Sequence, residues 1–420
     1  MKLVQLHNRT QVARRPWLLG AVLTTVGVAL AGCSVEVGEP QDFVSDREDA
    51  LTLYPDDDPF SSWSEVKDYK LVSASAVSDP AVCEKRGGYV IFYRNASNKI
   101  VSLTTDTSGA GSPSDPPGTP YRSSEWFTWP GRAQFDQKPA CVSLDPVDGS
   151  GAKNYELVVA GRGQNGKFLA TKPLVIPNVD DHGSEDLPNP GRNPWIKVSD
   201  QLYASAPAMS ASAVKDLVVI TGIGTDGRMY SHTRSWSDFD AGSWSNAIQA
   251  PQLPDGFAMS GSPTIAMTRG GVNLFTIVVR GTKRVRRRNQ SKYFFAYFNG
   301  TSYSSRLPDK VWLPLSISGP SSDPALEFTE YTGAGWVPNV LTLAYRKGSN
   351  IYQTSGYDEG LGSDNLIHNR GGTFTGSPAI KGVIGEAEGE YFHTIIARKS
   401  NGTLYESFVE RSDALGGLIP

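Results

Sequence analysis

The segment Ala204–Met209 reads ASAPAM, and Leu217–Ser231, which follows after a short gap, reads LVVITGIGTDGRMYS. A Pro-Ala step thus precedes an apolar run, Asp226-Gly227 interrupts that run, and an alternating segment leads on to Trp244. An Asp-Gly pair between two such runs predicts a β-hairpin, because a type I′ turn needs residues that tolerate positive φ. One hairpin alone would leave both faces of its sheet uncovered.

The same pattern recurs six times along the chain. Each copy has an opening proline, an apolar strand, a turn and a second strand, and the spacing of about 54 to 68 residues suits a four-stranded sheet with its loops. The sequence therefore predicts an all-β fold, a six-bladed β-propeller of four-stranded antiparallel blades, with seven blades as the alternative. The opening prolines are Pro80, Pro139, Pro207, Pro263, Pro324 and Pro378.

The ends of the repeat region indicate how the ring closes. We expect a single propeller domain over residues 61–412. Trp63 precedes the first complete repeat, whereas the last repeat ends at Val409 with no Trp-bearing segment after it. An N-terminal strand is therefore expected to complete the last blade, which would remove the open sheet edges.

The N-terminal segment has the features of an export signal. Residues 1–32 contain Arg14-Arg15, an apolar run and small residues, which is typical of a cleaved signal peptide. Leu30-Ala-Gly-Cys33 resembles the lipobox of bacterial lipoproteins, which implies that Cys33 is lipidated and anchors the chain. Residues 33–60 are acidic and predict a flexible tether. The expected location is the bacterial cell envelope, at the outer membrane or the cell surface rather than the inner membrane.

The charge of the chain limits its partners. Cleavage before Cys33 would leave 36 Lys and Arg against 43 Asp and Glu, so nucleic acid is not expected as a general partner. Two further cysteines, Cys83 and Cys141, lie just after the first two opening prolines. An oxidising compartment favours a disulfide between them, but their one-residue offset within the repeat argues against it, so two buried free thiols are the alternative.

Two groups of cations are candidate ligand-binding residues. An arginine ends the second strand in every repeat except the third, where Ile223 stands, and these arginines should form a ring on the face where the first strands begin. Each could bind carboxylates or sugar hydroxyls; the alternative is a structural pairing with acids or carbonyls of its own or the next blade. The second group fills the turn of the fourth repeat and could bind a sulfated or carboxylated glycan, or be a solvated hairpin tip. The two groups are Arg94, Arg162, Arg280, Arg346 and Arg398, and Lys283, Arg284, Arg286, Arg287 and Arg288.

The chain carries no sequence motif for catalysis. It has no His-Glu-x-x-His, no Gly-x-Ser-x-Gly and no Cys/His spacing for a metal, so no catalytic residue, metal or cofactor is predicted. A glycosidase needs only two carboxylates, which this sequence does not exclude.

The repeat also resembles a known family. Ser205–Ala208, Gly224–Tyr230 and the Trp that follows are similar to the bacterial propeller lectins related to fucose-binding lectins, and more loosely to sialidase-type propellers. The resemblance implies a lectin-like propeller that binds carbohydrate. We therefore favour a membrane-anchored glycan-binding protein over an enzyme. A propeller hydrolase or lyase acting on polysaccharide is the alternative, and a scaffold for protein partners is a third.

Overall fold

The computed structural model describes most of the repeat region, and the statements below concern the residues that it describes. The predicted signal peptide, Cys33 and the predicted tether lie outside them. No helix in the described part is long and apolar enough to cross a membrane. The described residues are 63–66, 73–85, 88–104, 127–128, 131–144, 156–172, 195–268, 274–305, 307, 309–329, 340–356, 367–384 and 391–411.

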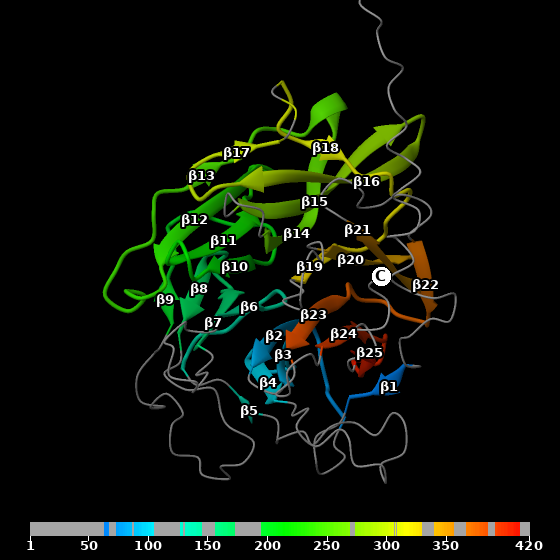
Figure 1. The fold of residues 1–420 in the computed structure, drawn as a ribbon, viewed down its shortest axis with the longest axis horizontal. Coiled ribbons are helices and arrows are strands. Elements are labelled where there is room, and N and C mark those ends of the chain that lie inside the picture. The colour runs from blue at the N-terminus through cyan, green and yellow to red at the C-terminus, as the bar shows by residue number, and fades with distance from the viewer. Residues whose placement is uncertain are drawn as a thin grey trace, which may run out of the picture. The chain divides into compact units, whose positions relative to one another are not determined.

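The described strands form six antiparallel sheets, and each sheet is one blade (Figure 1). Blades 1 to 3 follow the chain in order, and in each the second strand lies between the first and the third. Blade 1 contains β2 (Ala81–Lys85), β3 (Gly88–Arg94), β4 (Ile100–Thr104) and β5 (Phe127–Thr128); blade 2 contains β6 (Ala140–Leu144), β7 (Glu156–Arg162), β8 (Phe168–Thr171) and β9 (Ile196–Lys197); blade 3 contains β10 (Ala208–Ser212), β11 (Leu217–Ile223), β12 (Met229–Ser235) and β13 (Ile248–Gln249).

Blades 4 to 6 keep this order with two variations. A short 3-10 turn, η2 (Pro254–Gly256), precedes blade 4, and blade 4 has an extra strand that pairs with its third strand. Blade 4 contains β14 (Ala258–Thr268), β15 (Leu274–Val285), β16 (Arg288–Phe298), β17 (Tyr303–Ser304) and β18 (Leu313–Pro314); blade 5 contains β19 (Ala325–Thr329), β20 (Val340–Lys347), β21 (Asn350–Gly356) and β22 (Ile367–Gly371); blade 6 contains β23 (Ala379–Ile384), β24 (Tyr391–Arg398), β25 (Leu404–Arg411) and β1 (Ser64–Glu65).

The blades form a closed ring. The first strand of each blade contacts the first strand of the next, and β23 of blade 6 contacts β2 of blade 1. The labels of these six strands surround the centre of the fold in Figure 1. The prediction of a six-bladed β-propeller of four-stranded antiparallel blades is therefore confirmed.

Closure takes place in blade 6, as the sequence predicts. Ser64 pairs with Glu406 and Glu65 with Tyr405, so β1 adds the fourth strand beside β25. The Trp63 indole donates a hydrogen bond to the carbonyl oxygen of Arg370 at 2.9 Å and packs against Phe374 with ring centroids 4.5 Å apart. This side chain therefore ties the closing strand to blade 5.

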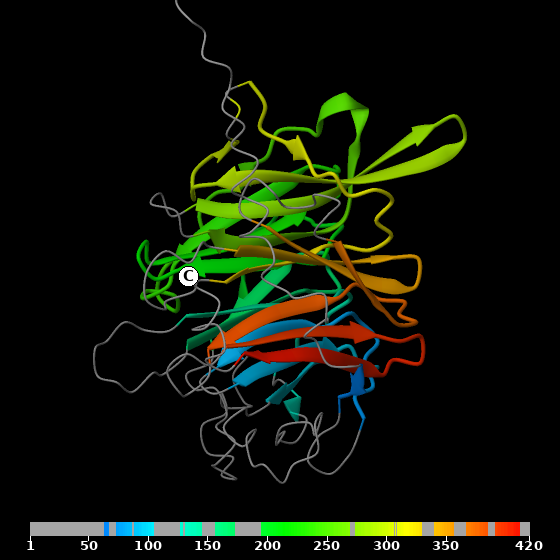
Figure 2. The same ribbon diagram turned by 45° about the vertical axis from the view of Figure 1, so that its right-hand side comes forward.

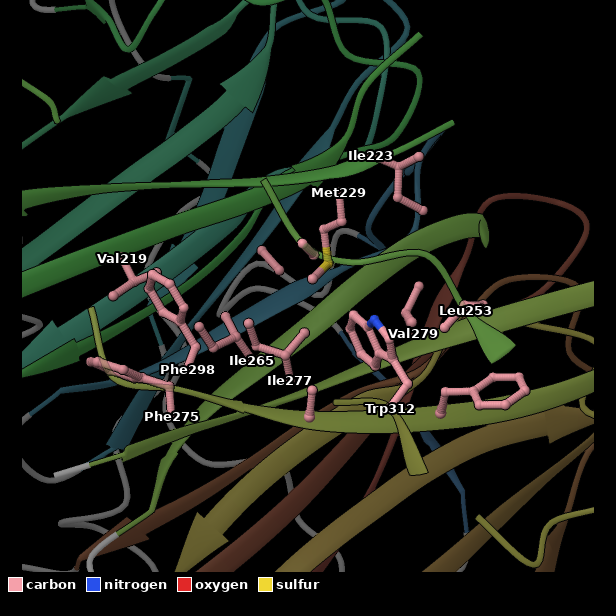
Figure 3. Close-up of a cluster of buried hydrophobic side chains, with 14 of the residues drawn as sticks. Val219, Ile223, Met229, Leu253, Ile265, Phe275, Ile277, Val279, Phe298 and Trp312 are labelled. Atoms are coloured by element: carbon pink, nitrogen blue, oxygen red, sulfur yellow. The ribbon is translucent and has the colours of Figure 1, made fainter. Parts of the chain in front are cut away.

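The spaces between blades contain the hydrophobic core. In the cluster between blades 3 and 4, Val219 and Met229 come from one blade, and Ile277, Phe298 and Trp312 from the other (Figure 3). All five side chains are buried. Burial of apolar area contributes about 25 cal/mol per Å². Each blade is therefore stabilised by its neighbours rather than by an interior of its own.

Residues of the first strands alternate between the two neighbouring blades. Val82, the second residue after Pro80, packs with blade 6, whereas Cys83, the third, packs with blade 2. Cys141 is the second residue after its own proline and therefore points back at blade 1. The structure joins Cys83 to Cys141 in a disulfide, with Cα atoms 6.0 Å apart. The one-residue offset, which we expected to oppose pairing, is what brings the two thiols together.

The role of Trp63 in attaching the closing strand to blade 5 can be tested by substitution. Trp63→Ala removes both the indole hydrogen bond and the contact with Phe374, and we expect a loss of about 2–4 kcal/mol in the free energy of unfolding. Trp63→Phe keeps a packing ring and should lose clearly less. Chemical denaturation of the two variants measures the difference. Equal stability of Trp63→Ala and the parent chain would contradict the role of this strand in closure.

Candidate functional site

The five predicted arginines lie at one face of the propeller. In each blade the second strand runs antiparallel to the first, so that its end lies beside the start of the first strand, as the pairings Ala81↔Phe92 and Ser260↔Arg280 show. We call this side, where the six first strands begin, the entry face. Arg94, Arg162 and Arg398 end their strands as predicted, whereas β15 continues past Arg280 to Val285 and β20 past Arg346 to Lys347.

Three of the arginines make ion pairs at the openings of blades, and two of these pairs are close. Arg398 in blade 6 contacts Asp79 at the opening of blade 1, with Nε and Nη2 at 3.2 and 3.0 Å from Oδ1. Arg162 in blade 2 contacts Asp136 at 2.6 Å and donates to the carbonyl oxygen of Ala204 at the opening of blade 3. All four ionic side chains are mostly shielded from solvent. The contacts with Asp79 and with Ala204 join neighbouring blades.

Two further arginines are held mainly by uncharged groups. Arg346 donates to the carbonyl oxygens of Gly376, Gly348 and Ser321, the first of which belongs to the opening of blade 6. Arg94 donates to the side-chain oxygen of Asn98 in its own turn. Burial lowers the pKa of the Arg94 guanidinium, Asp136 counteracts this effect, and Arg398 adds to it. The charges of blades 6, 1 and 2 therefore influence one another.

Arg280 of blade 4 is held less firmly than the other four. Its Nη2 lies 3.6 Å from Oδ1 of Asp323, beyond hydrogen-bond distance, and its buried Nε has no hydrogen-bond partner. Buried Nε atoms without a partner also occur in Arg94 and Arg162, so the long contact with Asp323 is what distinguishes Arg280.

The residues just before the opening prolines carry a signal that our reading of the sequence missed. Gly376 precedes blade 6, and a Cβ atom there would overlap the carboxylate of Asp79; Gly261 stands in the same relation to Asp323. The backbone amide of Ser377 also donates to Oδ2 of Asp79 at 2.9 Å. A glycine at the opening of one blade therefore leaves room for the aspartate carboxylate at the opening of the next blade.

The basic turn belongs to a long hairpin on the entry face. Strand β15 has 12 residues, whereas the second strands of the other blades have 7 or 8. Figure 2 shows its yellow-green turn standing beyond the ends of the neighbouring strands. Lys283 donates to the carbonyl oxygen of Asp255, and Lys292 lies over the ring of Phe257 at 5.9 Å. The four arginines Arg284, Arg286, Arg287 and Arg288 are exposed.

A groove of about 650 Å³ lies beside this hairpin. The hairpin contributes three cations and several uncharged polar side chains, and the segment leading into blade 5 contributes the opposite wall. Among the described residues, no carboxylate and no aromatic ring lines the groove. Its residues are Val285, Arg286, Arg288, Asn289, Gln290, Ser291, Lys292, Ser318 and Gly319.

The first strands contain one cluster of buried charges. Lys381 of blade 6 pairs with Glu327 of blade 5 at 2.7 Å, and both side chains are largely buried. Burial raises the pKa of Glu327, and the charge of Lys381 only partly opposes this increase. Burial alone would lower the pKa of Lys381, but the carboxylates of Glu327 and Glu84 have the larger combined effect, so the pKa of Lys381 is raised. The two carboxylates thus share one cation. No group of three or more potential metal ligands occurs in the part of the chain that the structure describes.

Comparison with known proteins identifies the fold. The chain matches no protein-family model and no curated protein. It is similar to an α-L-arabinofuranosidase from Fusarium graminearum in complex with an iminosugar inhibitor, with TM-score 0.52 and 11% identity over 85% of this chain and 100% of that one. It is also similar to a triple arginine-to-alanine mutant of AofleA from Arthrobotrys oligospora, with TM-score 0.51 and 10% identity over 84% and 89% of the two chains.

A lectin is among the other matched structures. The SapL1 lectin in complex with α-methyl fucoside has TM-score 0.42 and 12% identity, over 78% of this chain and 94% of that one. At these identities the first two likenesses show the β-propeller fold and no more.

The arginine ring predicts unequal effects of substitution. Arg398→Ala leaves Asp79 beside Gly376 without its cation and should cost about 1–3 kcal/mol of stability, because a shielded carboxylate loses its partner. Arg280→Ala removes a longer contact and should cost clearly less. Thermal and chemical unfolding of the two variants checks this order. Arg280→Ala as the more destabilising change would contradict the assignment of Arg398 as the stronger link between blades.

Proposed function

We propose that this chain is an exported, lipid-anchored β-propeller that binds carbohydrate through its entry face. The observation that carries the proposal is the groove beside the β15–β16 hairpin, whose described lining consists mainly of hydrogen-bonding and cationic side chains and includes no carboxylate. Cations and amides can hold sugar hydroxyls and acidic substituents, but they cannot supply the two carboxylic acids of a glycosidase. This lining favours binding over hydrolysis.

The carboxylates near the arginine ring support the same choice. Asp79 accepts from Arg398 and from the amide of Ser377, and Asp136 is paired with Arg162. Carboxylates that each balance a shielded arginine are poorly placed to act as a general acid or as a nucleophile. In our proposal Arg162, Arg346 and Arg398, which bond to the opening of a neighbouring blade, are architectural. Arg280, whose ion pair is 3.6 Å long, is the ring arginine that we assign to a ligand.

A hydrolase is the second candidate. The arabinofuranosidase in complex with an iminosugar inhibitor is the structure with TM-score 0.52, and a propeller can carry either activity. For such an activity Glu327 is the candidate general acid, because burial raises its pKa. Its ion pair with Lys381 and its burial count against this role.

Binding and hydrolysis can be separated in one experiment. The full-length chain is screened on a glycan array, and each polysaccharide bound is then incubated with the protein and assayed for released reducing sugar. We expect binding without release. Release of sugar that Glu327→Gln abolishes, while binding persists, would favour the hydrolase. The absence of any carbohydrate binding would contradict the proposed function.

The anchor needs a separate test. Cys33→Ser should prevent lipidation and move the protein from the membrane fraction to the soluble fraction of the producing bacterium. Labelling with a fatty-acid analogue and fractionation measure the two effects. Retention of both label and membrane association in Cys33→Ser would exclude Cys33 as the anchor and leave the binding proposal untouched.

A further inference from the structure

We infer that the groove beside the β15–β16 hairpin binds an anionic polysaccharide, one whose sugars carry sulfate or carboxylate groups. This inference rests on the proposed function, since it names the class of glycan and the blade that holds it.

Uncompensated charge is the first observation. Residues 281–292 contain six lysines and arginines and no acid. Across the described part of the chain, none of these cations takes part in an ion pair; Lys283 donates only to a backbone carbonyl oxygen. Like charges held this close on a two-stranded ribbon repel one another. A ligand with several negative groups would relieve that repulsion and gain charge-assisted hydrogen bonds.

The backbone of the turn is the second observation. Arg286 and Arg287 have φ values of 45° and 69°, in the region that type I′ turns require. In the equivalent turns of blades 1, 2, 3 and 6 the residues with positive φ are Asn98, Gly166, Gly227 and Gly402. Two arginines at such positions hold a conformation that is unfavourable for them and that Asn or Gly adopts easily. The turn of blade 4 therefore carries two charged residues at positions where Asn or Gly would be more stable.

The length of the hairpin is the third observation, because it carries the cations beyond the ends of the neighbouring strands. The additional residues of β15 extend it by about 15 Å at 3.3 Å per residue. Pairing continues to the tip, with Lys283 opposite Gln290 and Val285 opposite Arg288. The cations are thus carried on a paired ribbon along one wall of the groove, and Lys347, whose Nζ lies 3.4 Å from the Ser318 hydroxyl, adds a charge near the other wall. An extended polymer fits this arrangement better than a small ion.

The uncharged residues of the groove indicate a sugar polymer. Asn289, Gln290, Ser291 and Ser318 offer donors and acceptors to hydroxyl groups. Single-stranded nucleic acid is usually held by stacking of bases on aromatic rings, and none of the described lining residues is aromatic. A membrane surface would be met by several exposed apolar side chains, whereas Val285 is the apolar residue of the lining. Cations that bind acidic substituents, together with polar side chains that bind hydroxyl groups, suit an acidic glycan.

The turn allows a variant that removes charge without weakening the fold. Arg286→Asn combined with Arg287→Gly supplies the residues that a type I′ turn prefers, so the hairpin should be as stable as before or more stable. The matched control is Arg132→Gln combined with Lys215→Gln, which removes two exposed cations from loops in other blades. Both variants change the net charge by the same amount.

Binding of the full-length chain, its turn variant and its control variant is measured with heparin, polygalacturonate and neutral dextran. We expect the parent chain to prefer heparin or polygalacturonate over dextran, and the affinity to fall as salt is added. The turn variant should bind the preferred polyanion roughly tenfold or more weakly, since Arg286 is lost from the groove lining and the charge of Arg287 from the tip beside it, and the control should bind like the parent.

The remaining outcomes each contradict a defined part of the inference. Equal binding by the turn variant and the control would remove the hairpin groove as the site. Preference for neutral glycans would overturn the anionic class and leave the proposed function standing, whereas binding to no glycan at all would overturn both. Binding of single-stranded DNA as tightly as heparin would show a general polyanion site and overturn the assignment to polysaccharide.

Discussion

The whole fold depends on the fact that a four-stranded blade can bury its two faces only against its two neighbours. In the first strands this requirement divides alternate residues between the preceding and the following blade, as with Val82 and Cys83. A ring with one uncovered blade would expose an apolar face and an open sheet edge. Pairing of β1 with β25 removes both liabilities, and the short strand is held in place by Trp63.

Polar contacts at the entry face follow the same rule. Arg398 and Asp79 are 319 residues apart in the chain and belong to blades that meet only because the ring closes. Gly376 leaves the space that the Asp79 carboxylate fills, and the Ser377 amide holds its second oxygen. Most of the ring is therefore committed to holding blades together, which leaves Arg280 and the basic hairpin for recognition.

Much of the fold could be predicted from patterns among residues that are close together in the sequence. Asp-Gly and Asn-Gly turns, opening prolines and apolar strands are properties of neighbouring residues, so the six blades, their strand order and the place of the arginines could be inferred from the repeat. The partners of the arginines could not, because Asp79 and Asp323 act on residues of another blade. The offset of Cys83 and Cys141 was misinterpreted for a related reason: facing blades present opposite faces of their sheets, so cysteines that meet must differ by one position. The basic turn was visible as a charged segment, but its extension into a ribbon depends on pairing across β15 and β16.

Closure by an N-terminal strand also determines how the protein would carry mechanical load. A pull on the chain from its N-terminal side reaches Trp63 and β1 first, where a two-residue strand is held by its pairing with β25. Force applied there would peel this strand from the rim of blade 6 before it strained the other five blades. For a protein tethered at its N-terminus, the indole of Trp63 and its bond to Arg370 would then form the first point of resistance between the anchor and the ring.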